Sequence, residues 1–433
     1  MQEVHLSPLP NSITAEVSIP GSLSYTIRAL MIAAMTEGSV SIVNPVKSDD
    51  SYAMVGVLQT LGISVEERDD RFIVHGNVKD IVDKKYILDI NISGRTARSV
   101  LALLTVVPGE KILTCKEAFK KRPIEDLVDG LRQLGAKIAY LEQDGRLPVR
   151  IESSRLISGT ARMTGFLSSQ YFSAIMMVAP LVGEIQIEVI GEQSSKPFID
   201  VTIATMKTFG VEVTSENYKR YIIKGNQQYK NPGEYLVEAD AIAASYFWGI
   251  AAITKSKIKV LHLSPDSAQG DIRFADILEK MGCIVKKNAH EKWIEVQGTD
   301  NLHGITVDMN ATPDSSVTLA VVAAFAKGTT IINGLEHIKT KETDRLEAPK
   351  NELEKMDIEV KTTDDAITIQ GGEPKAAIIN SYGDHRIAMA FAVAGTKISG
   401  VTITNPDVVT KSFTNFWDKL NELGIGIERK EIS

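Results

Sequence analysis

Leu58-Gln-Thr-Leu-Gly62-Ile-Ser-Val65 joins two sequence patterns at a glycine. The apolar residues before the glycine recur at three- and four-residue spacing, which indicates the buried face of an amphipathic helix. The alternating residues after it are typical of a half-buried strand. Glycine adopts the left-handed conformation that commonly ends a helix. The stretch therefore predicts a helix that stops at Gly62 and leads into a strand.

The same arrangement occurs six times along the 433 residues. Its turn positions are 62, 135, 210, 282, 357 and 424, so successive turns are 73, 75, 72, 75 and 67 residues apart. Five turn residues are Gly, and the sixth, Asp357, is of a type that tolerates left-handed backbone better than most. A period of roughly seventy residues indicates a repeat fold, with more than one helix and strand in each repeat. Six repeats divide into two sets of three, with a break near 233–240.

Composition narrows the classes of function. Hydrophobic residues make up 43 % and charged residues 24 %, as is ordinary for a globular chain. The net charge of −7 gives no overall basic field for nucleic acid or an anionic membrane. Two cysteines, Cys115 and Cys283, cannot build a disulfide framework and suit a reducing cytoplasm. No signal-peptide pattern and no apolar run of membrane-spanning length is visible.

Cationic residues gather beside Gly or Ser just ahead of apolar runs that indicate helices. A helix N-terminus offers free backbone N–H groups, and an added Arg allows bidentate binding of phosphate or carboxylate. Because such loops recur at related points of the repeats, we expect one site for a ligand with several negative groups. No nucleotide-binding glycine motif is present. The loops are 20–28 before a helix over 29–35, 91–98 before 99–107, 120–124 before a helix near Glu125, 164–170 before 171–179, 339–345 and 383–386.

Carboxylates lie in the same set of loops. Asp314 precedes the apolar stretch 317–326, and Glu342 lies inside the basic run 339–345. An Asp at a helix start is usually an N-cap. A carboxylate held among cations instead stays ionised and can accept a proton from a substrate hydroxyl. Both interpretations of Asp314 remain open from the sequence.

In this order, the loops resemble those of the 3-phosphoshikimate 1-carboxyvinyltransferase (5-enolpyruvylshikimate-3-phosphate synthase) family, and the resemblance covers essentially the whole chain. The most specific segment is Lys341-Glu-Thr-Asp-Arg345, followed by Asp384-His-Arg386 and Lys411-Ser-Phe413. The supporting segments are Arg122-Pro-Ile124, Ser168-Ser-Gln170, Ser195-Lys-Pro197, Gln269-Gly-Asp271, Asp308-Met-Asn310 and Pro313-Asp314.

The resemblance implies an α/β fold of two similar domains, each built from three βαβαββ repeats in an inside-out α/β barrel. Residues 1–19 with 237–433 would form one domain and 20–236 the other. The active site would lie in the interdomain cleft and be completed by domain closure. The family works in the cytoplasm, in the shikimate pathway of aromatic amino acid biosynthesis. We expect a monomer that acts on small molecules, without a metal or organic cofactor and without nucleic acid or membrane as a partner.

The implied reaction is an addition–elimination. The 5-hydroxyl of shikimate 3-phosphate attacks C2 of phosphoenolpyruvate while C3 is protonated, and the tetrahedral intermediate loses phosphate. The implied catalytic residues are Asp314, Lys341, Glu342, His385 and Lys411. Asp314 would be the base that deprotonates the hydroxyl. Glu342 would transfer the proton at C3, with help from His385 or Lys411. Substrate binding falls to Ser22, Ser24, Arg28, Gly94, Arg98, Arg122, Ser168, Ser169, Gln170, Ser195, Arg345 and Arg386. The shikimate phosphate would be held by Ser168, Ser169 and Ser195, together with Lys341. The shikimate carboxylate would be held by Arg28. Arg122, Gln170, Arg345, Arg386, Lys411 and the backbone at Gly94 would hold phosphoenolpyruvate.

The chain departs from the family pattern mainly on the shikimate side. Leu23 replaces a Lys that contacts both substrates, and losing this cation could cost several kcal/mol of transition-state stabilisation. Three interpretations follow: Arg95 replaces the missing charge, the enzyme uses a different alcohol acceptor, or the chain is a weakly active binding homologue. Arg95 also lies in the Gly94 turn that governs glyphosate binding in the family, so we expect weakened binding of that inhibitor. The other departures are Ile27, Ile92, Phe198, His337 and Lys339.

Two other functions remain open from the sequence. The related UDP-N-acetylglucosamine carboxyvinyltransferase shares the fold and keeps a reactive Cys near the position of Cys115. The spacing from Cys115 to Arg122 differs, however, so we interpret Cys115 as a small loop or strand residue. A repeat scaffold that binds a partner protein is the non-enzymatic alternative. It predicts exposed apolar area and no affinity for small phosphorylated acids.

Overall fold

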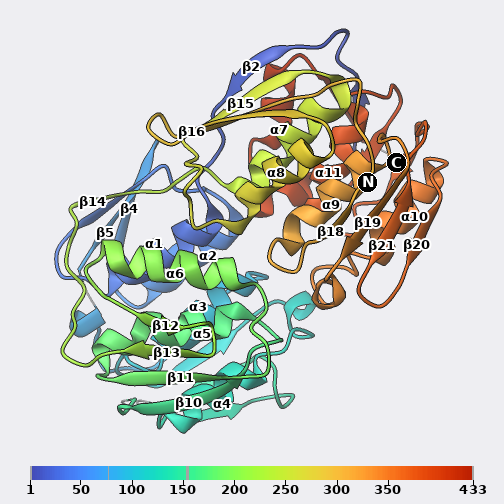
Figure 1. Cartoon of the computed structure of the whole chain (residues 1–433). Helices are drawn as coiled ribbons and strands as arrows, with labels where there is room; N and C mark the ends of the chain where they lie inside the picture. The colour runs from blue at the N-terminus through green and yellow to red at the C-terminus, as the bar shows by residue number, and fades with distance from the viewer. Residues whose placement is uncertain (1, 77, 153–155, 432–433) are drawn as a thin grey trace. The chain divides into compact units, whose positions relative to one another are not determined.

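The computed structural model describes residues 2–76, 78–152 and 156–431. The chain divides into two compact units. We call residues 21–237 the N-terminal unit and residues 1–20 with 238–433 the C-terminal unit. Both are coloured along the chain in Figure 1. Among the described residues, no helix is long and apolar enough to cross a membrane.

The strands of the described residues form six four-stranded sheets, one in each repeat, and all six have the same strand order. In the second repeat, β6 (Tyr86–Asp89) runs parallel to β7 (Lys111–Thr114). Strand β7 pairs antiparallel with β9 (Val149–Ile151), and β9 pairs antiparallel with β8 (Ile138–Tyr140). The predicted fold class, an α/β fold with three βαβαββ repeats in each half, is confirmed.

The other elements of the N-terminal unit follow this plan. Its helices are α1 (Leu23–Ala34), α2 (Asp49–Thr60), α3 (Gly94–Leu103), α4 (Glu125–Gln133), α5 (Ser169–Val178) and α6 (Lys196–Thr208). The remaining strands are β3 (Val40–Val43), β4 (Ser64–Arg68), β5 (Arg71–His75), β10 (Gly159–Thr164), β11 (Ile185–Ile190), β12 (Thr214–Glu216), β13 (Arg220–Ile223) and β14 (Glu234–Leu236).

The C-terminal unit has the same composition of elements. Its helices are α7 (Ala241–Thr254), α8 (Arg273–Lys280), α9 (Ser316–Ala323), α10 (Glu347–Lys355), α11 (His385–Gly395) and α12 (Phe416–Glu422). Its strands are β1 (Gln2–Ser7), β2 (Thr14–Val17), β15 (Lys257–Leu261), β16 (Ile284–Asn288), β17 (Trp293–Gln297), β18 (Thr306–Asp308), β19 (Thr329–Asn333), β20 (Val360–Thr362), β21 (Ile367–Gln370), β22 (Ile378–Ile379), β23 (Thr402–Thr404) and β24 (Gly426–Glu431).

The first helix of each repeat lies in the core of its unit. Every residue of α1, α9 and α11 is buried, and so are all but one residue of α5 and α7. A helix that is apolar on all sides is stable only when other elements surround it. In Figure 1 these helices lie inside each unit and the sheets lie outside them. Ser22, Gly94, Ser168 and Arg386 lie at the N-termini of core helices, whereas Arg122, Ser195 and Arg345 lie at or just before the starts of second helices.

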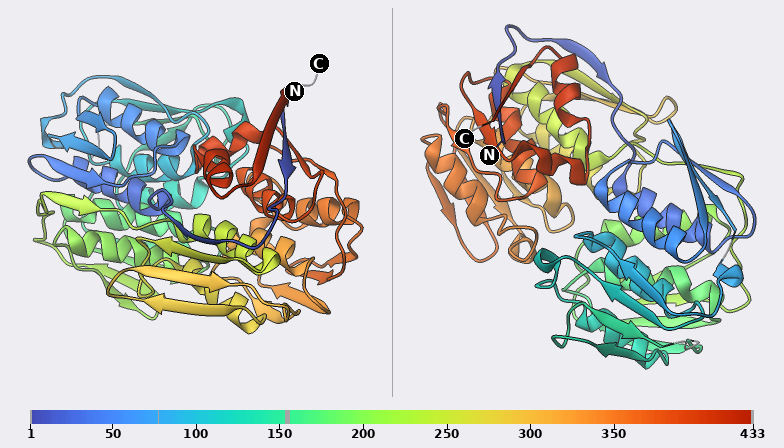
Figure 2. Two further views of the ribbon diagram at one scale, coloured as in Figure 1. Left: turned by 90° about the horizontal axis from the view of Figure 1, so that it is seen from above. Right: turned by 180° about the vertical axis from the view of Figure 1, so that it is seen from behind.

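Three strands fill places in sheets that are distant in sequence. Strand β1 pairs antiparallel with β24, so the two ends of the described chain lie side by side, as Figure 2 also shows. Strand β2 runs parallel to β15 in the C-terminal unit. Strand β14 runs parallel to β3 in the N-terminal unit. The chain therefore passes from one unit to the other twice, after Pro20 and after Val237.

The second helix of each repeat ends in the same hydrogen-bonded turn. All six turn residues have positive φ, between 67° at Asp357 and 102° at Gly282. In the first repeat the Gly62 N–H donates to the Gln59 carbonyl and the Ile63 N–H to the Leu58 carbonyl, the pattern of a Schellman motif. The residue after the turn packs its side chain inward in every case. The equivalent pairs are Ala136 with Leu131, Val211 with Met206, Cys283 with Leu278, Ile358 with Leu353 and Ile425 with Leu420.

Three of the helices that follow cationic loops begin earlier than their apolar runs predict, and α5, which begins at Ser169 instead of residue 171, differs least. Helix α1 begins at Leu23 instead of residue 29, and α3 begins at Gly94 instead of residue 99. All the polar residues in the first turns of α1 and α3 except Arg95 are buried, which hides them from an apolar pattern. The Thr26 hydroxyl, for example, donates to the Ser22 carbonyl and accepts from the Val46 N–H. Arg28, Arg95 and Arg98 therefore lie within helices, and the prediction that they precede them is wrong.

The repeated turn predicts different costs for the same substitution at two sites. A Cβ at Gly282 would lie 2.4 Å from the Asn301 carbonyl oxygen, whereas a Cβ at Gly424 meets only Leu9, at 3.8 Å. We expect Gly424→Ala to cost about 1 kcal/mol of unfolding free energy, for the left-handed backbone alone. Gly282→Ala should cost about 1–3 kcal/mol more, because the backbone must move.

Urea unfolding followed by tryptophan fluorescence measures this difference. All three tryptophans, Trp248, Trp293 and Trp417, lie in the C-terminal unit with both glycines. Equal unfolding free energies for the two variants would contradict the clash at Gly282.

Candidate active site

In the N-terminal unit, Arg28 connects three helices. Its guanidinium donates to the Thr202 hydroxyl on α6 at 2.7 Å, to the Ser173 hydroxyl on α5 at 3.2 Å and to the carbonyl of Ser24 at 2.9 Å. Burial and the nearby charge of Arg95 lower the pKa of Arg28 to about 10. Two guanidinium groups close together favour an anion beside them. Ser22 is the N-cap of α1 and is buried, as is Ser24.

A second group of predicted residues gathers at the start of α3. Arg98 donates from Nη1 to the Gly94 carbonyl at 3.1 Å and to the Gln170 side-chain oxygen at 3.2 Å. A Cβ at position 94 would lie 2.8 Å from Nη1 of both Arg98 and Arg122. A side chain at position 94 would therefore push both guanidinium groups away from this helix N-terminus. The structure therefore brings Gly94, Arg98, Arg122 and Gln170 together as one cationic group.

The predicted phosphate-binding serines lie at the starts of α5 and α6. Ser168 is the N-cap of α5, and its hydroxyl accepts from the Gln170 N–H at 3.3 Å. Ser195 is the N-cap of α6, with left-handed backbone at φ 50°. The Ser194 N–H donates to the Gly165 carbonyl at 3.0 Å, which joins the two loops. Ser169 and Ser195 are buried, and each lies at the start of its helix. The two linked helix N-termini favour an anion.

In the C-terminal unit, Arg345 is the centre of the candidate site. Its side chain is 2 % exposed and contacts three carboxylates. Nη1 donates to Asp314 and Nη2 to Glu342, both at 2.8 Å. Nε and Nη2 donate to the two oxygens of Asp384, at 2.8 and 3.1 Å. These ion pairs raise the pKa of Arg345, so the guanidinium remains charged although it is buried.

Asp314 lies between two arginines. Its second oxygen is 3.3 Å from Nη2 of Arg386. Residue 314 lies inside the 3₁₀ helix Pro313–Ser315, and the N-cap position of α9 is Ser315. The structure thus favours the charged-carboxylate interpretation of Asp314 over the N-cap interpretation. Two guanidinium groups beside a carboxylate favour its charged form.

The remaining predicted catalytic residues surround Glu342. The Lys411 ammonium donates to Glu342 Oε1, while Arg345 holds Oε2. Burial and the charge of Arg386 place the pKa of His385 well below its ordinary value, so its imidazole is neutral at neutral pH. Of the two helpers expected for Glu342, the geometry therefore favours Lys411. Burial and the charge of Lys341 lower the pKa of His337 to about 4.

Several residues that hold the site together have no distinguishing signal in the sequence. Asp384 lay within a motif used for the resemblance, and its pairing with Arg345 had no separate signal. Thr202 and Ser173 orient Arg28 from the middle of two helices, where no pattern distinguishes them. Asp271 is buried, accepts from the Ser315 hydroxyl at 2.8 Å, and has its pKa raised to about 7 by burial and by Asp314.

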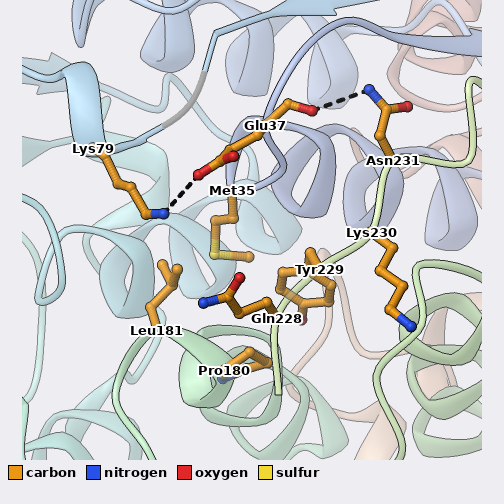
Figure 3. Close-up of a pocket in the computed structure, with 9 residues that line it drawn as sticks. All are labelled: Met35, Glu37, Lys79, Pro180, Leu181, Gln228, Tyr229, Lys230 and Asn231. Atoms are coloured by element: carbon orange, nitrogen blue, oxygen red, sulfur yellow. Dashed lines mark hydrogen bonds and ion pairs between the residues drawn. The ribbon is translucent and has the colours of Figure 1, made fainter. Parts of the chain in front are cut away.

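A separate cavity of about 510 Å³ lies at the opposite ends of the core helices of the N-terminal unit. Figure 3 shows Met35, which follows α1, near Pro180 and Leu181, which follow α5. Glu37 pairs with Lys79 at 2.7 Å on its rim. Helix C-termini carry the negative end of the dipole and disfavour anions. None of the predicted substrate residues lines this cavity.

The described residues include no cluster of three or more His, Cys, Asp or Glu that could hold a metal.

Comparison with known proteins identifies the family. The family model described as EPSP synthase (3-phosphoshikimate 1-carboxyvinyltransferase) matches residues 9–420. A protein of that name from Sulfurovum sp. (strain NBC37-1) is 40 % identical and covers 98 % of this chain and 99 % of its own. A namesake from Vibrio vulnificus (strain YJ016) is 39 % identical with the same coverage. The chain belongs to the 3-phosphoshikimate 1-carboxyvinyltransferase family.

Solved structures show the same fold at lower identity. An EPSP synthase from Acinetobacter baumannii superimposes with a TM-score of 0.85 at 24 % identity, with full coverage of both chains. The enolpyruvyl transferase NikO from Streptomyces tendae gives 0.82 at 17 % identity, over 100 % of this chain and 99 % of its own. The fold is therefore the one shared by enolpyruvyl transferases.

Cys115 does not have the environment of a reactive thiol. It follows β7, and burial raises the pKa of its thiol to about 11. A nucleophilic Cys needs a lowered pKa, because the thiolate is the reactive form. The structure therefore supports the interpretation of Cys115 as a small residue beside a strand.

This environment predicts slow alkylation. At pH 7.5 the thiolate fraction of Cys115 should be below about one part in a thousand, and iodoacetamide labelling should accelerate about tenfold per pH unit up to pH 9.5. Enzymatic turnover should survive labelling, and Cys115→Ser serves as the unlabelled control. Rapid labelling at pH 7 that abolishes turnover and is blocked by substrate would contradict this account.

Proposed function

We propose that the chain transfers the enolpyruvyl group of phosphoenolpyruvate to the 5-hydroxyl of shikimate 3-phosphate and releases phosphate. The observation that carries the proposal is Asp314, held by Arg345 and Arg386 beside a separate Glu342–Lys411 pair. One carboxylate is placed to take a proton and one acid–base pair to deliver another. The family's name supports the substrates.

In the first step, Asp314 accepts the proton of the 5-hydroxyl while that oxygen bonds to C2 of phosphoenolpyruvate. The C2–C3 double bond opens, and Glu342, with Lys411, supplies the proton at C3. Arg345 stabilises both carboxylates before and after these transfers, since it contacts each of them. In the second step, Glu342 with Lys411 takes a proton back from C3 and the C2–O bond to phosphate breaks, which restores the double bond in the product ether. The proton that Asp314 accepted leaves with the phosphate, so both carboxylates return to their starting states. Positioned acids and bases of this kind contribute about 10²–10⁴-fold.

Substrate binding follows the charges of each unit. We assign the shikimate phosphate to Ser168, Ser169 and Ser195 with Lys341, and the shikimate carboxylate to Arg28, with Ser22 and Ser24 beside it. We assign the binding of phosphoenolpyruvate to two groups of residues. One is Gly94, Arg98, Arg122 and Gln170, and the other is Arg345, Arg386 and Lys411. Bringing two polyanions together is mainly positioning and electrostatic work, for which preorganised cations are suited. The proposal requires residues of both units in one reaction.

Leu23 is the main departure within this scheme. It begins α1 and is buried, so position 23 supplies no charge to the site. Arg95 lies close enough to Arg28 to lower its pKa. We assign to Arg95 the cationic role that position 23 lacks. The proposal also takes the chain to act as a monomer in the cytoplasm, which its two free cysteines suit.

Phosphate release tests the function. Wild-type protein with phosphoenolpyruvate and shikimate 3-phosphate should release phosphate, and omission of shikimate 3-phosphate should abolish the release. Asp314→Asn should lower kcat about 10²–10⁴-fold, because the proton acceptor is lost. Asp364→Asn, which removes an exposed carboxylate paired with Lys339, is the matched control.

The variant Leu23→Lys separates the possible failures. A wild type and a Leu23→Lys variant that both fail to turn over would overturn the proposed function. A gain of several orders of magnitude in the variant would show that Arg95 does not supply the missing charge. We expect the turnover of Leu23→Lys to differ from that of the wild type by less than about tenfold.

A further inference from the structure

Glu352 is a buried carboxylate that the proposed reaction does not use. It lies on α10, and its side chain is 0 % exposed. Lys355, one turn later, donates to both of its oxygens at 2.7 and 2.8 Å. A buried carboxylate is costly unless its oxygens accept hydrogen bonds. Glu352 therefore needs its partners, and they depend on it in turn.

Two of these partners lie in the segment between β22 and α11. The Asn380 N–H donates to Glu352 Oε2 at 3.0 Å, and the Tyr382 hydroxyl donates to Oε1 at 2.7 Å. Burial and the Glu352 carboxylate raise the pKa of Tyr382 to about 12, so the hydroxyl remains a donor. Glu352 thus holds both a backbone and a side-chain group of this segment.

The segment held by Glu352 has an unfavourable backbone conformation. Tyr382 has φ 54° and Gly383 has φ 68°, two left-handed residues in succession. A bulky residue such as Tyr rarely adopts this conformation, which persists only where surrounding contacts impose it. The Asn380 side chain accepts from the Tyr382 N–H at 2.9 Å, and the Asp384 N–H donates to the Ser381 carbonyl at 2.8 Å. Together these contacts fix the turn that precedes Asp384.

Asp384 transmits the position of this turn to the candidate site. It is the N-cap of α11, where Oδ1 accepts from the Arg386 N–H at 2.9 Å. Both of its oxygens also hold Arg345, which in turn contacts Asp314 and Glu342. A shift of the turn would therefore move Asp384, Arg345 and the two carboxylates assigned to proton transfer.

We propose that Glu352 is a positioning residue of the active site, which acts through Asn380 and Tyr382 to fix Asp384 and thereby Arg345. It touches no substrate and takes no part in proton transfer. This inference rests on the proposed function, because Asp314, Glu342 and Arg386 owe their roles to it. Loss of Glu352 should therefore impair the use of phosphoenolpyruvate, which we assign to the residues around Arg345.

The variant Glu352→Gln tests the proposal. Its amide N–H₂ cannot accept a hydrogen bond, so one of the two oxygens that accept from Asn380, Tyr382 and Lys355 is lost together with the negative charge, while the side-chain shape is kept. We expect kcat/KM for phosphoenolpyruvate to fall about 10–100-fold and KM for shikimate 3-phosphate to change by less than threefold. The matched control is Glu354→Gln, the same change at an exposed residue two positions along α10.

A second variant follows the path of the contacts. Tyr382→Phe removes only the hydroxyl that meets Glu352, and we expect a fall of about three- to tenfold in kcat/KM. The double variant should have the same kcat/KM as Glu352→Gln alone, because both changes disrupt the contact between Glu352 and Tyr382. Additive losses, or a Glu352→Gln variant within twofold of wild type, would overturn the proposal. An equal rise in KM for both substrates would do the same.

Failure of the function and failure of the inference remain distinguishable. Wild-type turnover is measured first, and its absence overturns the proposed function alone. Hydrogen exchange of the backbone amides of 382–386 tests the positioning without substrate. The amides should exchange at least tenfold faster in Glu352→Gln than in Glu354→Gln, at unchanged exchange of α7. Equal rates would contradict a positioning role whatever the turnover.

Discussion

One buried guanidinium organises the chemistry of the C-terminal unit. Arg345 is in contact with Asp314, Glu342 and Asp384, which come from three separate segments of the chain. Each carboxylate would be costly to bury alone, and Arg345, together with Arg386 beside Asp314 and Lys411 beside Glu342, offsets that cost. The same contacts fix the distance between the two carboxylates that we propose accept and deliver protons. Under that proposal, stability and catalysis in this unit depend on the same ion pairs.

The repeat explains why these segments meet. Every repeat ends its second helix in a Schellman turn, which sets the direction of the strand that follows. The first helix of each repeat is thereby kept in the core, with its N-terminus at the end where Ser, Gly and Arg residues gather. The cavity at the other ends of α1 and α5 contains none of these residues. The scaffold repeats, and the functional residues are those in which the repeats differ.

The fold could be predicted from the sequence because it follows from a local signal, a left-handed residue between two periodicities. Gly62 and its five equivalents carry that signal in full. The early starts of α1 and α3 could not be predicted, since Arg28 and Thr26 are polar residues whose burial depends on partners distant in sequence. The pairing of Arg345 with Asp384 is equally non-local. Motif resemblance located these residues, and only the structure shows that Arg345 contacts carboxylates of its own chain.

The central claim is that the C2–O bond of phosphoenolpyruvate breaks, as enolpyruvyl transfer requires. Phosphoenolpyruvate labelled with ¹⁸O at the oxygen between C2 and phosphorus tests it directly. Turnover with shikimate 3-phosphate should leave the label in the released phosphate and none in the organic product, as mass spectrometry would show. Label retained in pyruvate or in the product would mean that the P–O bond breaks, and would contradict the assignment of Asp314 and Glu342 to addition and elimination.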